Sequence, residues 1–302
     1  MKTTIQPVPT IAGQQDRLLQ KQAHNVSSVR RKMRTTTFYL VVSALVLLYL
    51  VPIFWTLSTS LRTDVNLFDT TQWLPHPMTF VHYVNLFQFL PDFGRFIFNT
   101  LLIATLSTVG MLFSCSTAGY ALARMRFPGR TVLLIILLLT LMVPGQVTLI
   151  PVYVQFRVLD WINTPLPLIV PFFFGNAFST FFFRQFFMTL PTELEEAAII
   201  DGAGRWRTFW SIIVPLSKPA FLALGLLTFV QQWNGFFAAS VYLQTRDQWV
   251  MTQALQSFIG QYMSLYGEIM AGVILMSLPI IILYIFAQRY IVEGIALSGI
   301  TG

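Results

Sequence analysis

Charged residues are scarce in this chain of 302 residues, since Asp, Glu, Lys and Arg together make up only 10% of it. Ordinary soluble domains contain about 25% charged residues, so the composition excludes a soluble enzyme, a disordered chain and a typical nucleic-acid-binding protein. Lys and Arg number 19 against 12 Asp and Glu, an excess that membrane topology explains better than nucleic-acid binding in so apolar a chain. The single cysteine, Cys115, excludes an internal disulfide and a multi-cysteine metal site.

Long apolar runs take the place of the missing charges, and hydrophobic residues make up 55% of the chain. A bilayer core requires about 20 apolar residues per helix. We therefore predict an all-α polytopic membrane protein with six transmembrane helices, at about 37–57, 96–122, 131–153, 163–183, 219–241 and 269–288. Two further charge-free windows, 70–91 and 248–267, are rich in proline or amide side chains and are expected to lie outside the membrane.

The loop charges predict the orientation of these spans. All but four of the Lys and Arg residues lie in the termini and in the loops on the same side, the exceptions being Arg62, Arg95, Arg157 and Arg246. Because Lys and Arg favour the cytoplasmic side, both termini are expected in the cytoplasm. The chain then consists of a cytoplasmic tail, residues 1–34, and a transmembrane domain, residues 35–302. We expect residues 1–29 to be poorly ordered.

No predicted span carries a charge near its centre. Proton-coupled carriers and voltage sensors depend on ionisable groups inside the bundle, so neither is favoured, and an energy source outside the membrane part is. An intramembrane enzyme is also disfavoured, because its catalytic carboxylates or histidines are missing from the spans. His76 and His82 lie six residues apart without acidic or cysteine partners nearby, so no metal site is expected.

Neutral polar residues do occur in the spans and are candidates for a substrate path. The set comprises Asn176, Ser179, Gln231, Gln232, Trp233 and Asn234. Gln231 and Asn234 share a helix face, and amides beside an aromatic ring suit a polyhydroxylated solute. The alternative is that these amides bond neighbouring helices to one another.

The cytoplasmic loop 184–218 predicts two short helices separated by glycine. Thr192 and Glu195 have the spacing of a capping box, and Gly202 offers a helix stop. Trp206, Phe209, Trp210 and Ile213 then recur with helical spacing up to Pro215, which is expected to end the second helix. The acidic first helix suits a protein groove with basic residues better than an anionic lipid surface, although a simple interfacial connector has the same pattern.

One set of residues in this loop resembles a known motif. The run Glu196-Ala197-Ala198, then Gly202 after three residues, Ile212 after nine more, and Val214-Pro215 is similar to the EAA motif of binding-protein-dependent ABC importer permeases. Val214 in place of Leu is the one departure. Asp201-Gly202-Ala203 also resembles the tripeptide that commonly follows EAA in this family.

Other stretches resemble the carbohydrate branch of the family, in particular the maltose-type second permease subunit. They are 120–124, 127–129 and 288–294. The family usually has Glu where this chain has Gly235, and it usually has a proline a few residues later that is missing here. These differences weaken any transfer of substrate detail.

The resemblance implies a half-channel that pairs with a homologous permease subunit, two ATPase subunits and an extracytoplasmic solute-binding protein in a bacterial or archaeal cytoplasmic membrane. The chain contains no GxxxxGK[ST] loop, so ATP and Mg²⁺ are expected in the partner ATPases and no cofactor in this chain. The resemblance assigns coupling to the ATPase to Glu195, Glu196, Ala197, Ala198, Asp201, Gly202, Ile212 and Pro215. The expected cargo is a sugar or oligosaccharide; the alternatives are a polyol or glycerol phosphate permease and an ATP-independent secondary carrier.

Overall fold

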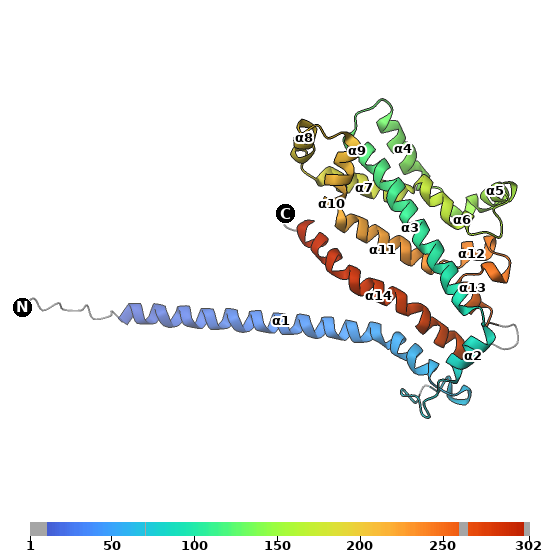
Figure 1. Cartoon of the computed structure of the whole chain (residues 1–302). Coiled ribbons are helices and arrows are strands. Elements are labelled where there is room, and N and C mark those ends of the chain that lie inside the picture. The colour runs from blue at the N-terminus through green and yellow to red at the C-terminus, as the bar shows by residue number, and fades with distance from the viewer. Residues whose placement is uncertain (1–10, 70, 260–264, 299–302) are drawn as a thin grey trace, which may run out of the picture. The chain divides into compact units, whose positions relative to one another are not determined.

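The computed structural model describes residues 11–69, 71–259 and 265–298 (Figure 1). Within these ranges, side chains are described from residue 32 to residue 288. The chain divides into two units, residues 1–58 and 59–302. Helix α1 (Ile11–Ser60) makes up the described part of the first unit and contains the predicted span 37–57.

The structure describes a helical backbone in part of the N-terminal tail, which the sequence predicted to be poorly ordered. Residues 1–10 lie outside the described residues, but the backbone is helical from Ile11 onward. The sequence contains no proline between Pro9 and Pro52, and Gln, Lys, Leu and Arg, which are good helix formers, are frequent in the tail. The apolar span therefore continues an existing helix instead of starting one.

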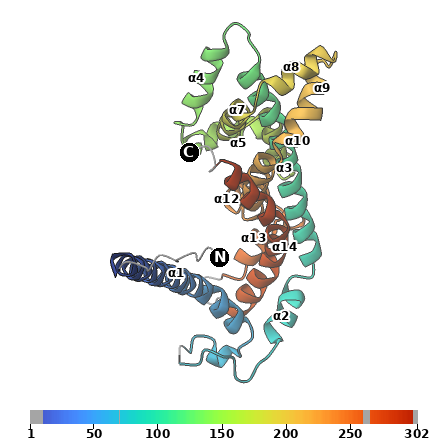
Figure 2. The same ribbon diagram turned by 90° about the vertical axis from the view of Figure 1, so that its left-hand side faces the viewer.

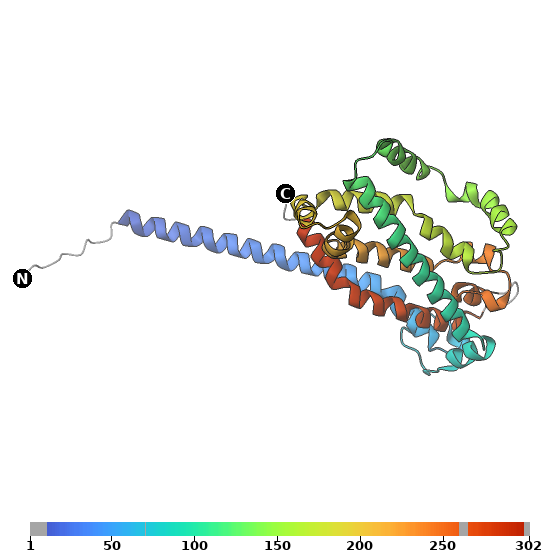
Figure 3. The ribbon, with the colours of Figure 1, turned by 45° about the horizontal axis from the view of Figure 1, so that its top comes forward.

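The second unit is built around α3 (Phe93–Arg124), which packs along α7 (Ala177–Thr189) and α11 (Lys218–Trp233) (Figures 1 and 3). Helix α14 (Tyr266–Ser298) packs against α11 and against α2 (Val81–Phe89). The remaining elements are short: η1 (Asp64–Asn66), α4 (Arg130–Thr140), α5 (Gly145–Val158), α6 (Leu166–Ile169), η2 (Val170–Phe174), α8 (Glu193–Ile200), α9 (Arg205–Thr208), the π-helical η3 (Phe209–Ile213), α10 (Val214–Leu216), α12 (Phe237–Tyr242), η4 (Arg246–Gln248) and α13 (Met251–Gln256). No strand occurs in the part of the chain that the structure describes.

The described residues contain four helices long and apolar enough to cross a membrane: Lys32–Ser60, Phe93–Arg124, Leu166–Thr189 and Tyr266–Gln288. The number rises to as many as six if two bent helix pairs each count as one span. The predicted spans 96–122 and 269–288 lie inside the continuous helices α3 and α14. Among the described residues, the window 70–91 contains the short helix α2, and the window 248–267 contains the short helix α13 and the first residues of α14; neither α2 nor α13 is a candidate span.

The other three predicted spans are interrupted. Span 131–153 corresponds to α4 and α5, which meet at 100°, because Pro144 holds an extended backbone conformation directly before α5. Span 163–183 changes from η2 to α7 at Gly175, where φ is +103°. Span 219–241 breaks at Asn234-Gly235, between α11 and α12. Hydropathy reports the length of an apolar run, and it does not detect these breaks.

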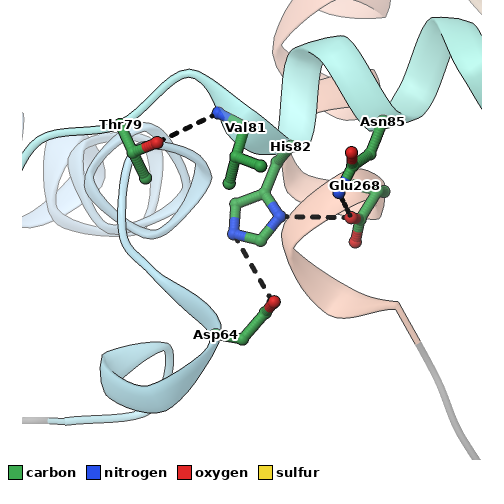
Figure 4. A network of polar contacts seen from close by, with 6 residues as sticks. All are labelled: Asp64, Thr79, Val81, His82, Asn85 and Glu268. Carbon is green, nitrogen blue, oxygen red and sulfur yellow. Dashed lines mark hydrogen bonds and ion pairs between the residues drawn. The ribbon is translucent and has the colours of Figure 1, made fainter.

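A buried polar network joins α2 to the start of α14 (Figure 4). The His82 side chain is 0% exposed, and its Nδ1 lies 3.3 Å from Oε1 of Glu268. The same carboxylate oxygen accepts a hydrogen bond of 3.1 Å from Nδ2 of Asn85. Asp64 approaches the other ring nitrogen at 3.8 Å. The two acidic neighbours that the sequence did not predict for His82 thus come from η1 and from the last long helix.

We expect Gly267→Ala to destabilise the protein, because a Cβ at this position would overlap the fully buried His82 ring. Overpacking of this kind costs about 1–3 kcal/mol of the free energy of unfolding. Thermal unfolding of the purified protein in detergent would measure the loss. Gly94→Ala in the first turn of α3 is the control, since no atom lies within 4 Å of its added Cβ; equal melting temperatures for the two variants would contradict the packing shown here.

Candidate functional site

The loop between α7 and α11 contains the predicted coupling residues, and its first helix is attached to α3 in a way that the sequence did not suggest. Thr192 precedes α8 in a helical conformation and makes no side-chain capping bond. Glu195 instead turns toward α3, where Oε1 lies 2.8 Å from Nε of Arg124 and Oε2 accepts a bond of 3.1 Å from the Tyr120 hydroxyl. The predicted capping box is therefore wrong. A guanidinium attracts the carboxylate more strongly than a neutral backbone N–H does.

The predicted EAA residues face two different ways. Glu196 and Ala197 are exposed, and no partner for Glu196 occurs among the described residues. Ala198 is buried against the rest of the chain. Ile199 and Ile200 follow at the surface, with exposed fractions of 57% and 85%. Ala198 therefore packs within its own chain instead of facing a partner, whereas the predicted partner contact of Ala197 stays a prediction that its exposure permits.

Gly202 ends α8 in a Schellman motif, as the sequence predicted for a helix stop. Its φ is +80°, and its N–H donates to the carbonyl of Ile199 at 3.0 Å. The N–H of Ala203 donates to the carbonyl of Ala198 at 2.8 Å. These two bonds define the motif. Asp201, which is exposed, is the C-cap residue of α8.

The second helix of the loop contains a π-turn, η3, between α9 and α10. Phe209 and Ile213 are buried, whereas Trp206 and Trp210 are 60% and 41% exposed. The four residues predicted to share one apolar face are thus divided between core and surface, because a π-turn shifts the regular helical spacing.

Two predicted coupling residues lie at the end of this second helix. Ile212 is half-buried and Pro215 is exposed. The helix passes through Pro215 and ends at Leu216, so the predicted helix end at Pro215 is confirmed to within one residue. Pro215 lies in the last turn of the continuous helix formed by α9, η3 and α10, where it can donate no N–H to the preceding turn.

We give the name coupling surface to six of the exposed side chains of this loop: Leu194, Glu196, Ile199, Ile200, Trp206 and Trp210. The two tryptophan rings contact each other edge to face at 5.9 Å. Helices α8 and α9 lie at the end of α3 opposite to α2 and α13 (Figure 2). Exposed apolar side chains around a charged group are typical of a protein–protein contact.

The six predicted path residues do not form one cluster. Asn176 caps α7 by accepting a bond of 3.0 Å from the N–H of Ser179, whose side chain is buried. The other four residues lie at the C-terminal end of α11, where Gln231 and Asn234 are exposed and the Asn234 amide donates to the carbonyl of Val230.

Trp233 does not line a path in this structure. Its side chain is 1% exposed, its ring stacks on Phe229 with centroids 5.6 Å apart, and its Nε1 donates to the carbonyl of Met276 at 3.1 Å. The predicted role of this ring as a sugar platform is therefore corrected to a core contact between α11 and α14. The indole N–H explains why: buried in the bundle, it requires an acceptor, and α14 supplies one.

Two pockets flank the end of α11, and each contains one of the predicted amides. The larger, about 630 Å³, is lined by Gln232 and by aromatic residues that include Phe156, Trp161 and Tyr242. The smaller, about 320 Å³, is lined by Asn234 together with Thr252, Gln256 and Ser277. The sequence missed these other lining residues, because α5, α12, α13 and α14 bring them together from distant segments.

Comparison with known proteins places the chain in a family. The profile described as "Binding-protein-dependent transport system inner membrane component" matches residues 110–296, more than half of the chain. An arabinooligosaccharide transport permease of Bacillus subtilis is 32% identical over 274 residues, covering 90% of this chain and 96% of that protein. A diacetylchitobiose uptake permease of Streptomyces coelicolor is 28% identical and covers 82% of each chain.

Two further comparisons extend the range of relatives. An sn-glycerol-3-phosphate transport permease of Yersinia enterocolitica is 33% identical over 241 residues, covering 75% of this chain and 85% of that one. A solved bacterial ABC transporter involved in import of the acidic polysaccharide alginate contains a chain with the same fold, at a TM-score of 0.72, 24% identity and coverage of 94% and 99%. The protein is an all-α, multi-pass membrane protein and belongs to the inner-membrane permease family of binding-protein-dependent ABC importers.

Proposed function

We propose that this chain is the permease subunit of an ATP-driven importer for a sugar or oligosaccharide, forming half of the translocation path. It pairs with a homologous permease subunit and receives cargo from an extracytoplasmic solute-binding protein. Two partner ATPase subunits bind ATP and Mg²⁺, and both termini of this chain lie in the cytoplasm, in agreement with the distribution of Lys and Arg.

The exposure of Glu196 supports the coupling role most directly. This carboxylate lies on the coupling surface, beside an exposed alanine and close in sequence to two exposed isoleucines. A short helix that presents a charge and apolar side chains to the outside fits a groove with a basic residue. Closure of the ATPases around ATP would move this helix as a rigid body, and the spans with it.

The pockets favour a neutral cargo. Neither of the described lining sets contains a charged side chain, whereas phosphate recognition favours Arg or Lys. Amide groups and aromatic rings match the hydroxyls and apolar faces of a sugar. The glycerol phosphate permease among the relatives keeps a phosphorylated cargo as the second candidate.

Transport by the complete complex in proteoliposomes tests this proposal. We expect uptake of labelled oligosaccharide that requires ATP at the cytoplasmic face and the binding protein at the other. Uptake with ADP alone would contradict ATP coupling. Uptake of glycerol phosphate in preference to every sugar would contradict the proposed substrate class and leave the coupling proposal standing.

A further inference from the structure

Helix α8 has little apolar contact with its own chain. Ala198 is its single buried residue, and its packing is mainly against the neighbouring short helix α9. If α8 is seated in an ATPase, as the proposed function requires, a firm connection is needed to carry its movement to the spans. The buried apolar area of α8 itself supplies no direct connection to α3, since the apolar route runs through α9 to Phe209 of η3, whose ring centroid lies 5.1 Å from that of Tyr120.

Polar contacts with the end of α3 do supply one. Arg124 and Glu195 form an ion pair at 2.8 Å, and their side chains are only 10% and 12% exposed. Arg124 also donates to the carbonyl of Leu190 in the turn before α8. Tyr120, one helical turn earlier on α3, holds the second carboxylate oxygen of Glu195. Both oxygens are thereby engaged, and each charge lies at the helix end that its sign favours.

Helix α3 carries this connection to the other side of the bundle. Its 32 residues span about 48 Å at 1.5 Å per residue. Ser107 of α3 donates at 2.8 Å to the carbonyl of Leu168, which lines the larger pocket and also accepts from Gln232. Nearer its start, Thr100 accepts a bond from the N–H of Met251 in α13. One helix is thus bonded to the coupling loop at one end and to pocket-forming segments at the other.

We propose that the Arg124–Glu195 pair, supported by Tyr120, is the internal link that transmits movement of α8 to α3, and that Glu195 acts within this chain instead of contacting the ATPase. The proposal rests on the proposed function. It divides the two adjacent carboxylates of the loop between two roles: Glu196 faces the partner, and Glu195 is a positioning residue. A contiguous set of contacts is not in itself evidence of coupling, so the test must measure coupling.

The test uses the complete complex in proteoliposomes and measures sugar uptake and ATP hydrolysis together. In Glu195→Gln and Arg124→Gln we expect the ATPases to remain bound and to hydrolyse ATP, while uptake falls about 10-fold, within the usual range of coupling between sites. ATP consumed per sugar imported therefore rises about 10-fold. The double variant Arg124→Glu/Glu195→Arg restores the opposite charges without the bonds to Leu190 and Tyr120, and should recover the part of the uptake that depends on the ion pair.

Glu193→Gln is the matched control, because Glu193 is exposed in the same first turn and should leave uptake and hydrolysis unchanged. The proposal is overturned if the Glu195 and Arg124 variants import sugar like the unaltered complex. It is also overturned if uptake and hydrolysis fall in parallel, or if the double variant is folded by thermal unfolding yet no better than the single ones. Failure of the proposed function would look different, because the unaltered complex would then show no ATP-dependent sugar uptake.

Discussion

Glu196→Lys should abolish most transport while leaving the protein folded in the membrane. The side chain is exposed and has no partner among the described residues, so reversing its charge removes no contact within the chain. Against a basic groove, the substitution replaces an attraction by a repulsion. Loss of one partner of a close interfacial charge pair costs about 2–5 kcal/mol, and we therefore expect uptake to fall about 30-fold or more, together with weaker retention of the ATPases.

Glu193→Lys makes the same change of charge in the same turn of α8 and separates a specific contact from a general effect of charge. We expect this control to import sugar at close to the normal rate. Normal uptake by Glu196→Lys would remove the basis for the coupling role of α8. Equal losses in the two variants would show that the loop responds to net charge and not to the carboxylate of Glu196.

Gly202→Val should have the second large effect, because Gly202 adopts a φ of +80° between α8 and α9. A left-handed conformation costs a residue with a Cβ about 1–2 kcal/mol, and a β-branched side chain makes it a clear outlier. The surroundings are open, with no atom within 4 Å of an added Cβ, so the cost arises in the backbone alone. We expect the turn to relax, the two halves of the coupling surface to separate, and uptake to fall about 10-fold or more.

A graded series at this position identifies the cause. Asn tolerates the left-handed conformation far better than Ala or Val does, so uptake should decrease in the order Gly, Asn, Ala, Val. Parallel measurements of ATPase retention on the purified complex should follow the same order. If Asn were as damaging as Val, the conformation of the turn would not be the reason.

The sequence predicted the features that depend on composition and on local spacing. Apolar length located the spans within the continuous helices α1, α3 and α14, and the helix stop at Gly202 followed from its place after a short acidic helix. The breaks inside the other spans were missed, because an apolar run reads the same whether the chain is straight or bent at Pro144. Their positions depend on how each half packs.

Contacts between distant segments were the hardest to predict. Glu195 has the sequence spacing of a capping box, in which it would bond to a backbone N–H. In the structure its carboxylate pairs with Arg124 of α3 instead. The sequence predicted that the Trp233 ring lies beside a polar path. In the structure its indole N–H donates to a carbonyl of α14. Both cases involve a polar group whose choice of partner is decided by tertiary packing.

Affinity purification through this subunit in mild detergent, with chain stoichiometry by mass spectrometry, tests the central claim most directly. We predict recovery of one copy of this chain with one homologous permease subunit and two ATPase subunits. Recovery of this chain alone or as a homodimer, with transport activity and without any ATPase, would contradict the proposal that it is half of an ATP-driven importer.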